Sequence, residues 1–143
     1  MPRLPRNERL HPTELHEAAN HVNLKRVNVL LKRPDAREAM DKGNNRRETP
    51  LHLAAGAKSP EVVEALLRAR ANPTRKDRKG KTARTRVEEH IKMLERFRAG
   101  IPGTGRNRSA INHQRVFIVD SQIEEFQRIA KMLKDAEGGK FPE

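Results

Sequence analysis

The chain contains no cysteine, tryptophan or tyrosine, and only four of its 143 residues are phenylalanine. Without cysteine there can be no disulfide, no thiolate nucleophile and no cysteine-bound zinc. So few aromatic rings also leave little surface for stacking on nucleic-acid bases. The absences therefore exclude cysteine-based enzymes and disulfide-stapled domains, and they count against base-stacking recognition.

Long apolar runs are absent as well. The first twelve residues, MPRLPRNERLHP, carry charge but no apolar stretch typical of a secretory signal. No later run approaches the length needed to span a bilayer. We therefore expect an intracellular protein, cytoplasmic and without a membrane partner. Hydrophobic residues make up 34% of the chain and charged residues 35%, which fits one small domain with tails.

Positive charge is abundant and locally concentrated. The net charge is +12, and the segment from Arg68 to Arg86 alone holds nine basic residues and one acid, a net charge of +8. From Asp120 to the end, six acids face four bases, a net charge of −2. The excess is thus a local feature, which indicates a specific acidic or anionic partner more than a general bias.

The sequence repeats itself. Thr49 begins TPLHLAAGAKSPEVVEALLRARANPTRKDRKGK, and Thr82 follows 33 residues later. Thr13 begins a similar stretch, TELHEAANHVNLKRVNVLL, 36 residues before Thr49. In that register the threonine, leucine, histidine and paired alanines of the two stretches coincide, and so do a valine and a leucine pair further on. Self-similarity at this period is typical of a solenoid of helical repeats.

The segment from Thr49 to Lys81 resembles an ankyrin repeat, on the strength of TPLHLAA, the VV and LL pairs at 62–67, and the closing Asp77 and Gly80. The resemblance implies an all-α ankyrin-repeat helical solenoid of two to three repeats with an additional C-terminal helix. We expect a basic flexible N-terminal tail over 1–12, repeats over 13–48 and 49–81, a degenerate cap over 82–99, a linker over 100–119, an amphipathic helix over 120–137 and a tail over 138–143.

The start of the repeat has the local chemistry of a helix N-terminus. Thr49 suits the N-cap and Pro50 the first helical position, where a missing N–H costs nothing. His52 stands at the third helical position and can hydrogen-bond back to Thr49, and His16 can do the same with Thr13. We therefore predict structural roles for this set of residues: Thr49, Pro50, Leu51, His52, Thr13 and His16.

Catalytic and metal-binding interpretations of these residues are weaker. A catalytic His52 would need a nucleophile and an orienting acid, but its neighbours are threonine, proline, leucine and alanine. In HEAANH the two histidines are five residues apart, whereas a zinc-binding helix needs a spacing of four. GKT at 80–82 lacks the first glycine of a phosphate-binding loop. We predict no enzyme, no metal, no cofactor and no small-molecule substrate.

Two further expectations concern the backbone of the repeat and the helix that follows it. Lys58 and Arg70 stand where the family has glycine, so each would be strained if its φ is positive. Residues 83–98 read as one helix with an apolar face of Val87, Ile91, Leu94 and Phe97.

Residues 115–119, RVFIV, read as a strand or a docking segment. Ser121 and Glu124 form a capping box at the start of a last helix whose apolar face consists of Ile123, Phe126, Ala130 and Leu133. That face is expected to pack on the repeats, with partner binding or dimerisation as the alternative.

RKDRKGK is the strongest functional feature of the sequence. Because connections between ankyrin repeats project as fingers beside the concave binding face, its bases would meet a partner first. The predicted partner-binding residues are Arg75, Lys76, Arg78, Lys79 and Lys81. The partner is predicted to be a protein with an acidic surface.

Three alternatives to the acidic protein partner stay open. Binding of a nucleic-acid backbone would be helped by tail arginines 3, 6, 9, 106 and 108. The same cluster could act as a nuclear-import patch in a eukaryotic host, or it could be only a solvated charge run.

Overall fold

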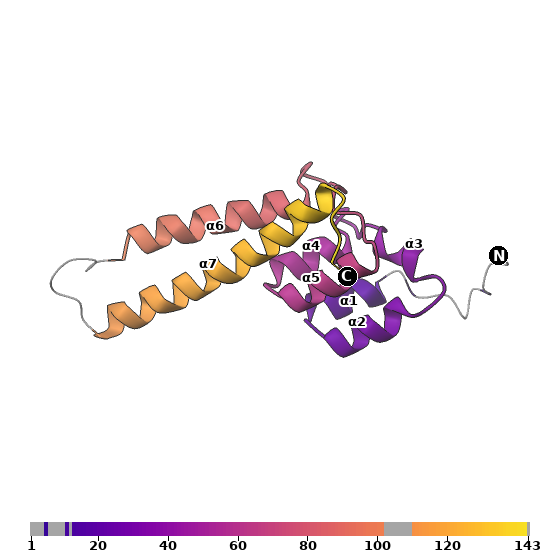
Figure 1. The fold of residues 1–143 in the computed structure, drawn as a ribbon, viewed down its shortest axis with the longest axis horizontal. Coiled ribbons are helices and arrows are strands. Elements are labelled where there is room, and N and C mark those ends of the chain that lie inside the picture. Colours follow the sequence, from indigo (N-terminus) through magenta and orange to yellow (C-terminus); the bar gives the residue numbers. More distant parts are fainter. Residues whose placement is uncertain (1–4, 6–10, 12, 102–109, 143) are drawn as a thin grey trace.

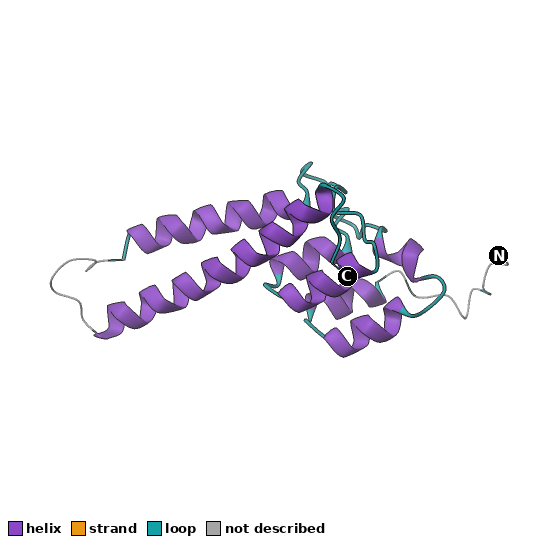
Figure 2. Ribbon diagram, viewed as in Figure 1, coloured by secondary structure: helices purple, strands orange, loops and turns teal. Residues whose placement is uncertain are grey.

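The computed structural model of the chain describes residues 5, 11, 13–101 and 110–142. Within these ranges the regular structure is entirely helical (Figure 2). The helices, in chain order, are α1 (Glu14–Asn20), α2 (Leu24–Leu31), α3 (Ala36–Met40), α4 (Pro50–Gly56), α5 (Pro60–Arg68), α6 (Ala83–Ala99) and α7 (Ala110–Glu137).

The helices form two rows of a short solenoid. Helix α1 packs against α4 and α4 against α6, while α2 packs against α5 and α5 against α7. The pairs α1–α2 and α4–α5 are consecutive in the sequence, and α6 packs along α7 as a third pair (Figure 1). The structure thus confirms the predicted all-α solenoid and assigns its C-terminal helix to the last pair.

The repeated residues form the core between the rows. Leu15 and Leu51 are at most 1% exposed, and the alanine pairs of α1 and α4 are at most 2% exposed, which lets neighbouring helices approach closely. The apolar face of α5 is completely buried: Val62, Val63, Leu66 and Leu67. Full burial of each such side chain contributes about 1.5–3 kcal/mol, so the repeated positions are the main stabilising element of the stack.

Helix α7 starts earlier than the sequence suggested. It begins at Ala110, so residues 110–119 are helical and the expected linker over 100–119 is wrong for that part. RVFIV is therefore neither a strand nor a separate docking segment, and Ser121 lies inside the helix and cannot be its N-cap. The reason is packing: Val116, Val119 and Ile123 follow at helical spacing and lie against Ile101 and α6.

Among the residues that the structure describes, four other than glycine have positive φ. Lys58 (φ 59°) and Arg70 (φ 67°) are the two that stand in place of family glycines. Val22 (φ 56°) precedes Lys58 by 36 residues, and Arg47 (φ 57°) precedes Gly80 (φ 73°) by 33. The strained turns therefore recur with the repeat, and a side chain at such a position costs about 1–2 kcal/mol.

The third pair is much longer than the others. Helix α6 has 17 residues and α7 has 28, against seven in α4 and nine in α5. Figure 1 shows both long helices running past the end of the stack. We call the projecting part, residues 90–101 and 110–123, the arm. It has an apolar cluster of its own, made of Ile101, Val119 and Ile123 with Ile91, Leu94 and Val116 packed around them.

Candidate partner-binding site

Two loops at the ends of successive repeats have the same local structure. In the first finger, residues 41–48, Asn44 Oδ1 accepts hydrogen bonds from the backbone N–H groups of Arg46 (2.9 Å) and Glu48 (3.0 Å). In the second finger, residues 72–81, Asp77 Oδ1 accepts from Lys79 (2.8 Å) and Lys81 (3.0 Å). One short acceptor side chain therefore shapes each finger.

The two fingers are bound to each other side by side. The backbone N–H of Arg78 donates to the carbonyl oxygen of Arg46 over 2.9 Å, and Asn72 N–H donates to Asp41 Oδ1 over 2.9 Å. The guanidinium of Arg75 donates through Nη2 to the carbonyl oxygen of Asp41 over 2.8 Å. Figure 2 shows these loops gathered beside the first turn of α6. The fingers thus form one surface.

His52 joins its own helix to the second finger. Thr49 Oγ1 lies 2.9 Å from His52 Nδ1, and the backbone N–H groups of Thr49 and His52 donate to the other residue's side chain, which completes a capping box. Because Nδ1 accepts from a backbone N–H, a neutral ring carries its hydrogen on Nε2 and donates it to the carbonyl oxygen of Lys81, 3.0 Å away. Burial lowers the pKa of His52, which favours this neutral ring.

The first repeat reproduces only half of this arrangement. His16 Nε2 lies 3.0 Å from the carbonyl oxygen of Glu48 and so holds the first finger as His52 holds the second. Thr13, in contrast, makes no side-chain capping bond to α1 and lies 2.7 Å from the ring of His11. Its backbone is helical, not extended, so the capping role predicted for Thr13 is wrong.

An ion-pair cluster underlies both fingers. Arg86 of α6 donates through Nη1 to Glu48 Oε1 over 2.8 Å, and its Nε lies 3.8 Å from Asp77 Oδ2. Burial raises the pKa of Glu48, but hydrogen bonds from Asn44 and Arg86 and the charge of Arg86 outweigh it, and the pKa lies below its usual value. For Asp77, backbone N–H donors and Arg86 likewise overcome burial and lower the pKa. Both carboxylates are therefore charged and fixed.

The predicted basic residues divide into two groups. Arg75 is held by Asp41, and Lys81 Nζ lies 2.6 Å from Glu89 Oε2. Lys76, Arg78 and Lys79 are exposed, and no side-chain hydrogen bond or ion pair holds them within the described ranges. Only these three of the five predicted residues are free to meet a partner.

The structure adds two residues that the sequence interpretation missed. Arg46 and Arg47 are exposed on the first finger, next to Arg78. The signal was present, since a shift of 33 residues places Arg46 on Lys79 and Arg47 on Gly80. We call Arg46, Arg47, Lys76, Arg78 and Lys79 the basic finger surface. The tail arginines 3, 6, 9, 106 and 108 lie outside the described residues.

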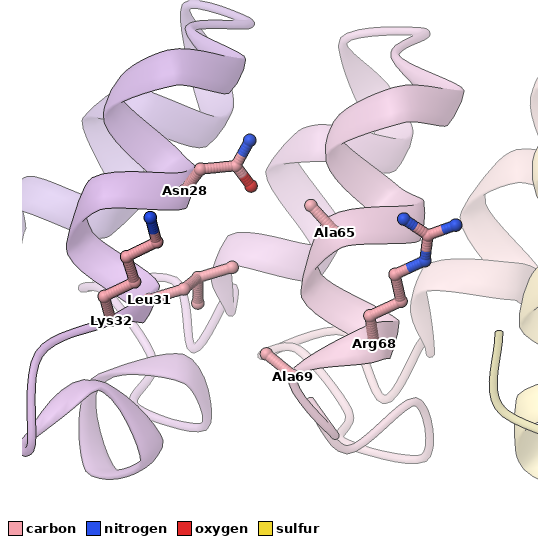
Figure 3. Close-up of a pocket in the computed structure, with 6 residues that line it drawn as sticks. All are labelled: Asn28, Leu31, Lys32, Ala65, Arg68 and Ala69. Carbon is pink, nitrogen blue, oxygen red and sulfur yellow. The ribbon is translucent and has the colours of Figure 1, made fainter. Parts of the chain in front are cut away.

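A concave region lies between α2 and α5. It has a volume of about 440 Å³ and is lined by Asn28, Leu31 and Lys32 from the α2 side and by Ala65, Arg68 and Ala69 from the α5 side (Figure 3). Arg68 is paired with Glu64 over 2.8 Å. The lining holds no carboxylate or imidazole, so it offers no group for proton transfer near neutral pH.

Among the residues that the structure describes, no three histidine, aspartate or glutamate side chains are arranged to hold a metal ion. In the same ranges, no helix is both long and apolar enough to cross a membrane.

Comparison with known proteins agrees with the fold. A family model described as ankyrin repeats (3 copies) matches residues 6–86. Over 80 residues, 54% of this chain, the sequence is 42% identical to human B-cell lymphoma 3 protein and 40% identical to its mouse homologue. The matched stretch spans 17% and 18% of the length of these two relatives. Since the family match covers more than half of the sequence, the chain belongs to the ankyrin repeat family.

Proposed function

We propose that this chain is a non-catalytic protein–protein interaction module that binds an acidic partner through the basic finger surface and the adjoining face of α1, α4 and α6. Ankyrin repeats generally mediate protein–protein interaction, and they do so with fingers and inner helices. For this chain we propose in addition the surface that contacts the partner, and that the partner is acidic.

The observation that carries the proposal is the pairing of the two fingers. The Arg78–Arg46 backbone bond of 2.9 Å brings cations from two repeats onto one surface, although they are 32 residues apart in the sequence. Like charges side by side repel, so the arrangement needs the support of the buried anions Glu48 and Asp77 behind it. A rigid set of exposed cations focuses positive potential outward, which steers an acidic partner and fixes its register.

The histidine geometry supports a binding role over a catalytic one. Both ring nitrogens of His52 are engaged, one with Thr49 and the other with the carbonyl oxygen of Lys81. The ring is 2% exposed, so it has neither a free nitrogen nor access to a substrate.

Charge reversal on the fingers tests the proposal. A fluorescently labelled glutamate-rich peptide is the probe, and fluorescence anisotropy measures its binding. Arg78→Glu with Lys79→Glu should weaken binding at least about tenfold, and adding Arg46→Glu should weaken it further. Arg128→Glu with Lys131→Glu is the matched control, because both residues are exposed on α7, away from the fingers. Equal affinity of the finger variant and the control would refute the role of the fingers.

Binding of a nucleic-acid backbone is the second candidate function, favoured by the same unpaired cations. A random DNA duplex replaces the peptide in the same assay. Backbone binding predicts an affinity that falls log-linearly with salt, at a similar slope for unrelated sequences. Absence of duplex binding at low salt would reject this candidate and leave the protein partner.

The location in the cell is a separate prediction. We expect the cytoplasm, with nuclear import through RKDRKGK as the alternative in a eukaryotic host. Imaging of a fluorescent fusion, with and without Arg78→Glu and Lys79→Glu, distinguishes the two.

A further inference from the structure

The side on which α6 and α7 face the rest of the stack continues outward along the arm. On α6, Arg86 marks this side, because it touches Glu48 and Asp77 of the fingers. Steps of four, three and four residues from Arg86 lead to His90, Met93 and Phe97, which therefore lie along the same side of the helix. Met93 is 57% exposed and Phe97 61% exposed, since α4 ends before it reaches them.

Helix α7 has a matching side. Glu125 marks it, because its carboxylate lies 3.8 Å from Lys58 Nζ at the turn between α4 and α5. Steps of three and four residues back along the helix lead to Gln122 and Ile118. Ile118 is 48% exposed. The stack-facing side of the arm thus carries exposed apolar side chains on both helices, Met93 and Phe97 on α6 and Ile118 on α7.

The opposite side of the two long helices is charged. On α6 it carries Glu88, Lys92, Glu95 and Arg96, and on α7 it carries Glu124, Arg128, Lys131 and Asp135. Of the large exposed apolar side chains of the arm, Met93, Phe97 and Ile118 thus lie on the stack-facing side and Phe117 lies on the charged side. The arm extends beyond the helices that would cover the stack-facing side (Figure 1). An uncovered amphipathic face of this kind is typical of an association surface.

The net charge of the arm indicates which kind of molecule is suited to cover its exposed apolar side chains. The arm, residues 90–101 and 110–123, holds four basic and two acidic residues, a net charge of +2, whereas the whole chain has +12. An acidic partner is therefore attracted to the fingers and not to this face. A second copy of the chain meets little repulsion here, and it brings the same apolar side.

We propose that the arms of two copies pack against each other, stack-facing side to stack-facing side, and form an antiparallel four-helix bundle. A two-fold axis makes the contact self-complementary, so that each copy places Phe97 and Ile118 against the other copy's arm. Each arm then lies in the angle between the arm and the stack of the other copy. The basic finger surfaces stay exposed, so the dimer presents two of them.

The short length of the arm limits the area that two copies can bury between them. Ten residues of α6 project from position 90 to its end, which corresponds to about 15 Å of helix. Two helices of that length bury an area at the low end of specific interfaces. We therefore expect a reversible dimer in exchange with its monomer and not a permanent one.

Sedimentation equilibrium of the whole chain tests the proposal. The monomer mass is 16.4 kDa, and the wild type should approach twice that mass as its concentration rises. Phe97→Asp with Ile118→Asp should remain monomeric throughout. Phe117→Asp is the matched control. Phe117 is 71% exposed on α7, the helix that carries Ile118, but it lies on the charged side, so this variant should still dimerise. Circular dichroism and the melting temperature establish that the variants are folded.

Two further measurements keep the test independent of any folding defect. Because the chain has no cysteine, Met93→Cys places a single thiol on the stack-facing side near the middle of the projecting part of α6, where a two-fold axis brings the two copies close, and mild oxidation should cross-link it faster than Phe117→Cys. Raising the salt from about 0.05 M to about 0.5 M should tighten the dimer by screening the repulsion between the parts of the two copies outside the arms, where most of each chain's charge of +12 lies. A wild type that stays monomeric at about 200 μM, or equal cross-linking of the two thiols, would overturn the proposal.

Discussion

Arg86 on α6 donates a hydrogen bond over 2.8 Å to Glu48, which lies 38 residues earlier at the end of the first finger. Asn44 also donates to Glu48, over 3.0 Å, so this carboxylate links the finger's own turn to the third helix pair. The third pair is thus tied to both fingers by side-chain hydrogen bonds as well as by apolar packing. The surface proposed to bind a partner depends on α6 for its shape.

Removing the arginine should therefore loosen the fingers. Arg86→Ala leaves the buried Glu48 and Asp77 without their cation, which we expect to cost about 1–3 kcal/mol in free energy of unfolding. Arg98→Ala is the control, because Arg98 pairs with Asp120 at 2.6 Å but its side chain is 51% exposed. Its loss should cost at most about 1 kcal/mol. Urea denaturation measures both values, and equal losses would contradict the special position of Arg86.

Stability should fall in two stages as the pH drops from 7 to about 3, the first from His52 and the second from the buried carboxylates. Burial lowers the pKa of His52, so the unfolded chain binds protons more readily than the folded one once the pH falls below the usual histidine value of about 6.5. Glu48 and Asp77 have lowered pKa values, so their contribution is complete above about pH 4 and is lost as the pH falls through the folded values.

The variant His52→Gln separates these two contributions. It should lower stability at pH 7 by about 1 kcal/mol, the value of a lost cap. It should also remove most of the fall between pH 7 and pH 5, while the fall below pH 4.5 remains. Urea midpoints at three pH values measure the effect. If the free energy of unfolding of the variant depended on pH between 7 and 5 as that of the wild type does, His52 would not take up a proton on unfolding.

The sequence predicts each repeat well because the signals are local. Thr49, Pro50 and His52 form a cap within four residues, and the apolar face of α5 lies within six. The positive φ of Lys58 and Arg70 could be foreseen, because the family has glycine there. The shape of both fingers could also have been foreseen, since Asn44 and Asp77 share one repeat position.

The third pair could not be predicted in the same way. Its two helices are separated by the segment 100–109, and nothing in either helix alone shows that they lie side by side. A short apolar run such as RVFIV fits a strand or a buried helix equally well, and only packing against α6 decides. The hydrogen bond between Arg86 and Glu48 also joins segments that are distant in the sequence. The sequence alone therefore could not show which basic residues pair within the protein and which are free to meet a partner.

Relief of backbone strain should stabilise the first repeat. Val22 has φ 56°, a conformation unfavourable for a β-branched residue, and its side chain is 45% exposed, so little packing is lost with it. Val22→Gly should raise the free energy of unfolding by about 0.5–1 kcal/mol after the extra entropy of the unfolded chain is subtracted. Gly80→Ala is the reverse experiment: φ is 73° and the space is open, so only strain is added and stability should fall by about 1 kcal/mol.

The role of α7 as the outer helix of the third pair rests on a residue that the predicted apolar face omitted. Ile129 is completely buried in the main core, whereas Ile118, on the same helix, is 48% exposed on the arm. Ile129→Ala should cost about 2–4 kcal/mol through the cavity that it leaves, and Ile118→Ala less than about 1 kcal/mol.

Thermal and urea unfolding at low protein concentration, where the arms of different copies do not associate, compare the two variants directly. A small effect of Ile129→Ala would mean that α7 leaves the stack in solution. The binding unit would then be a stack of two repeats, which is marginal on its own.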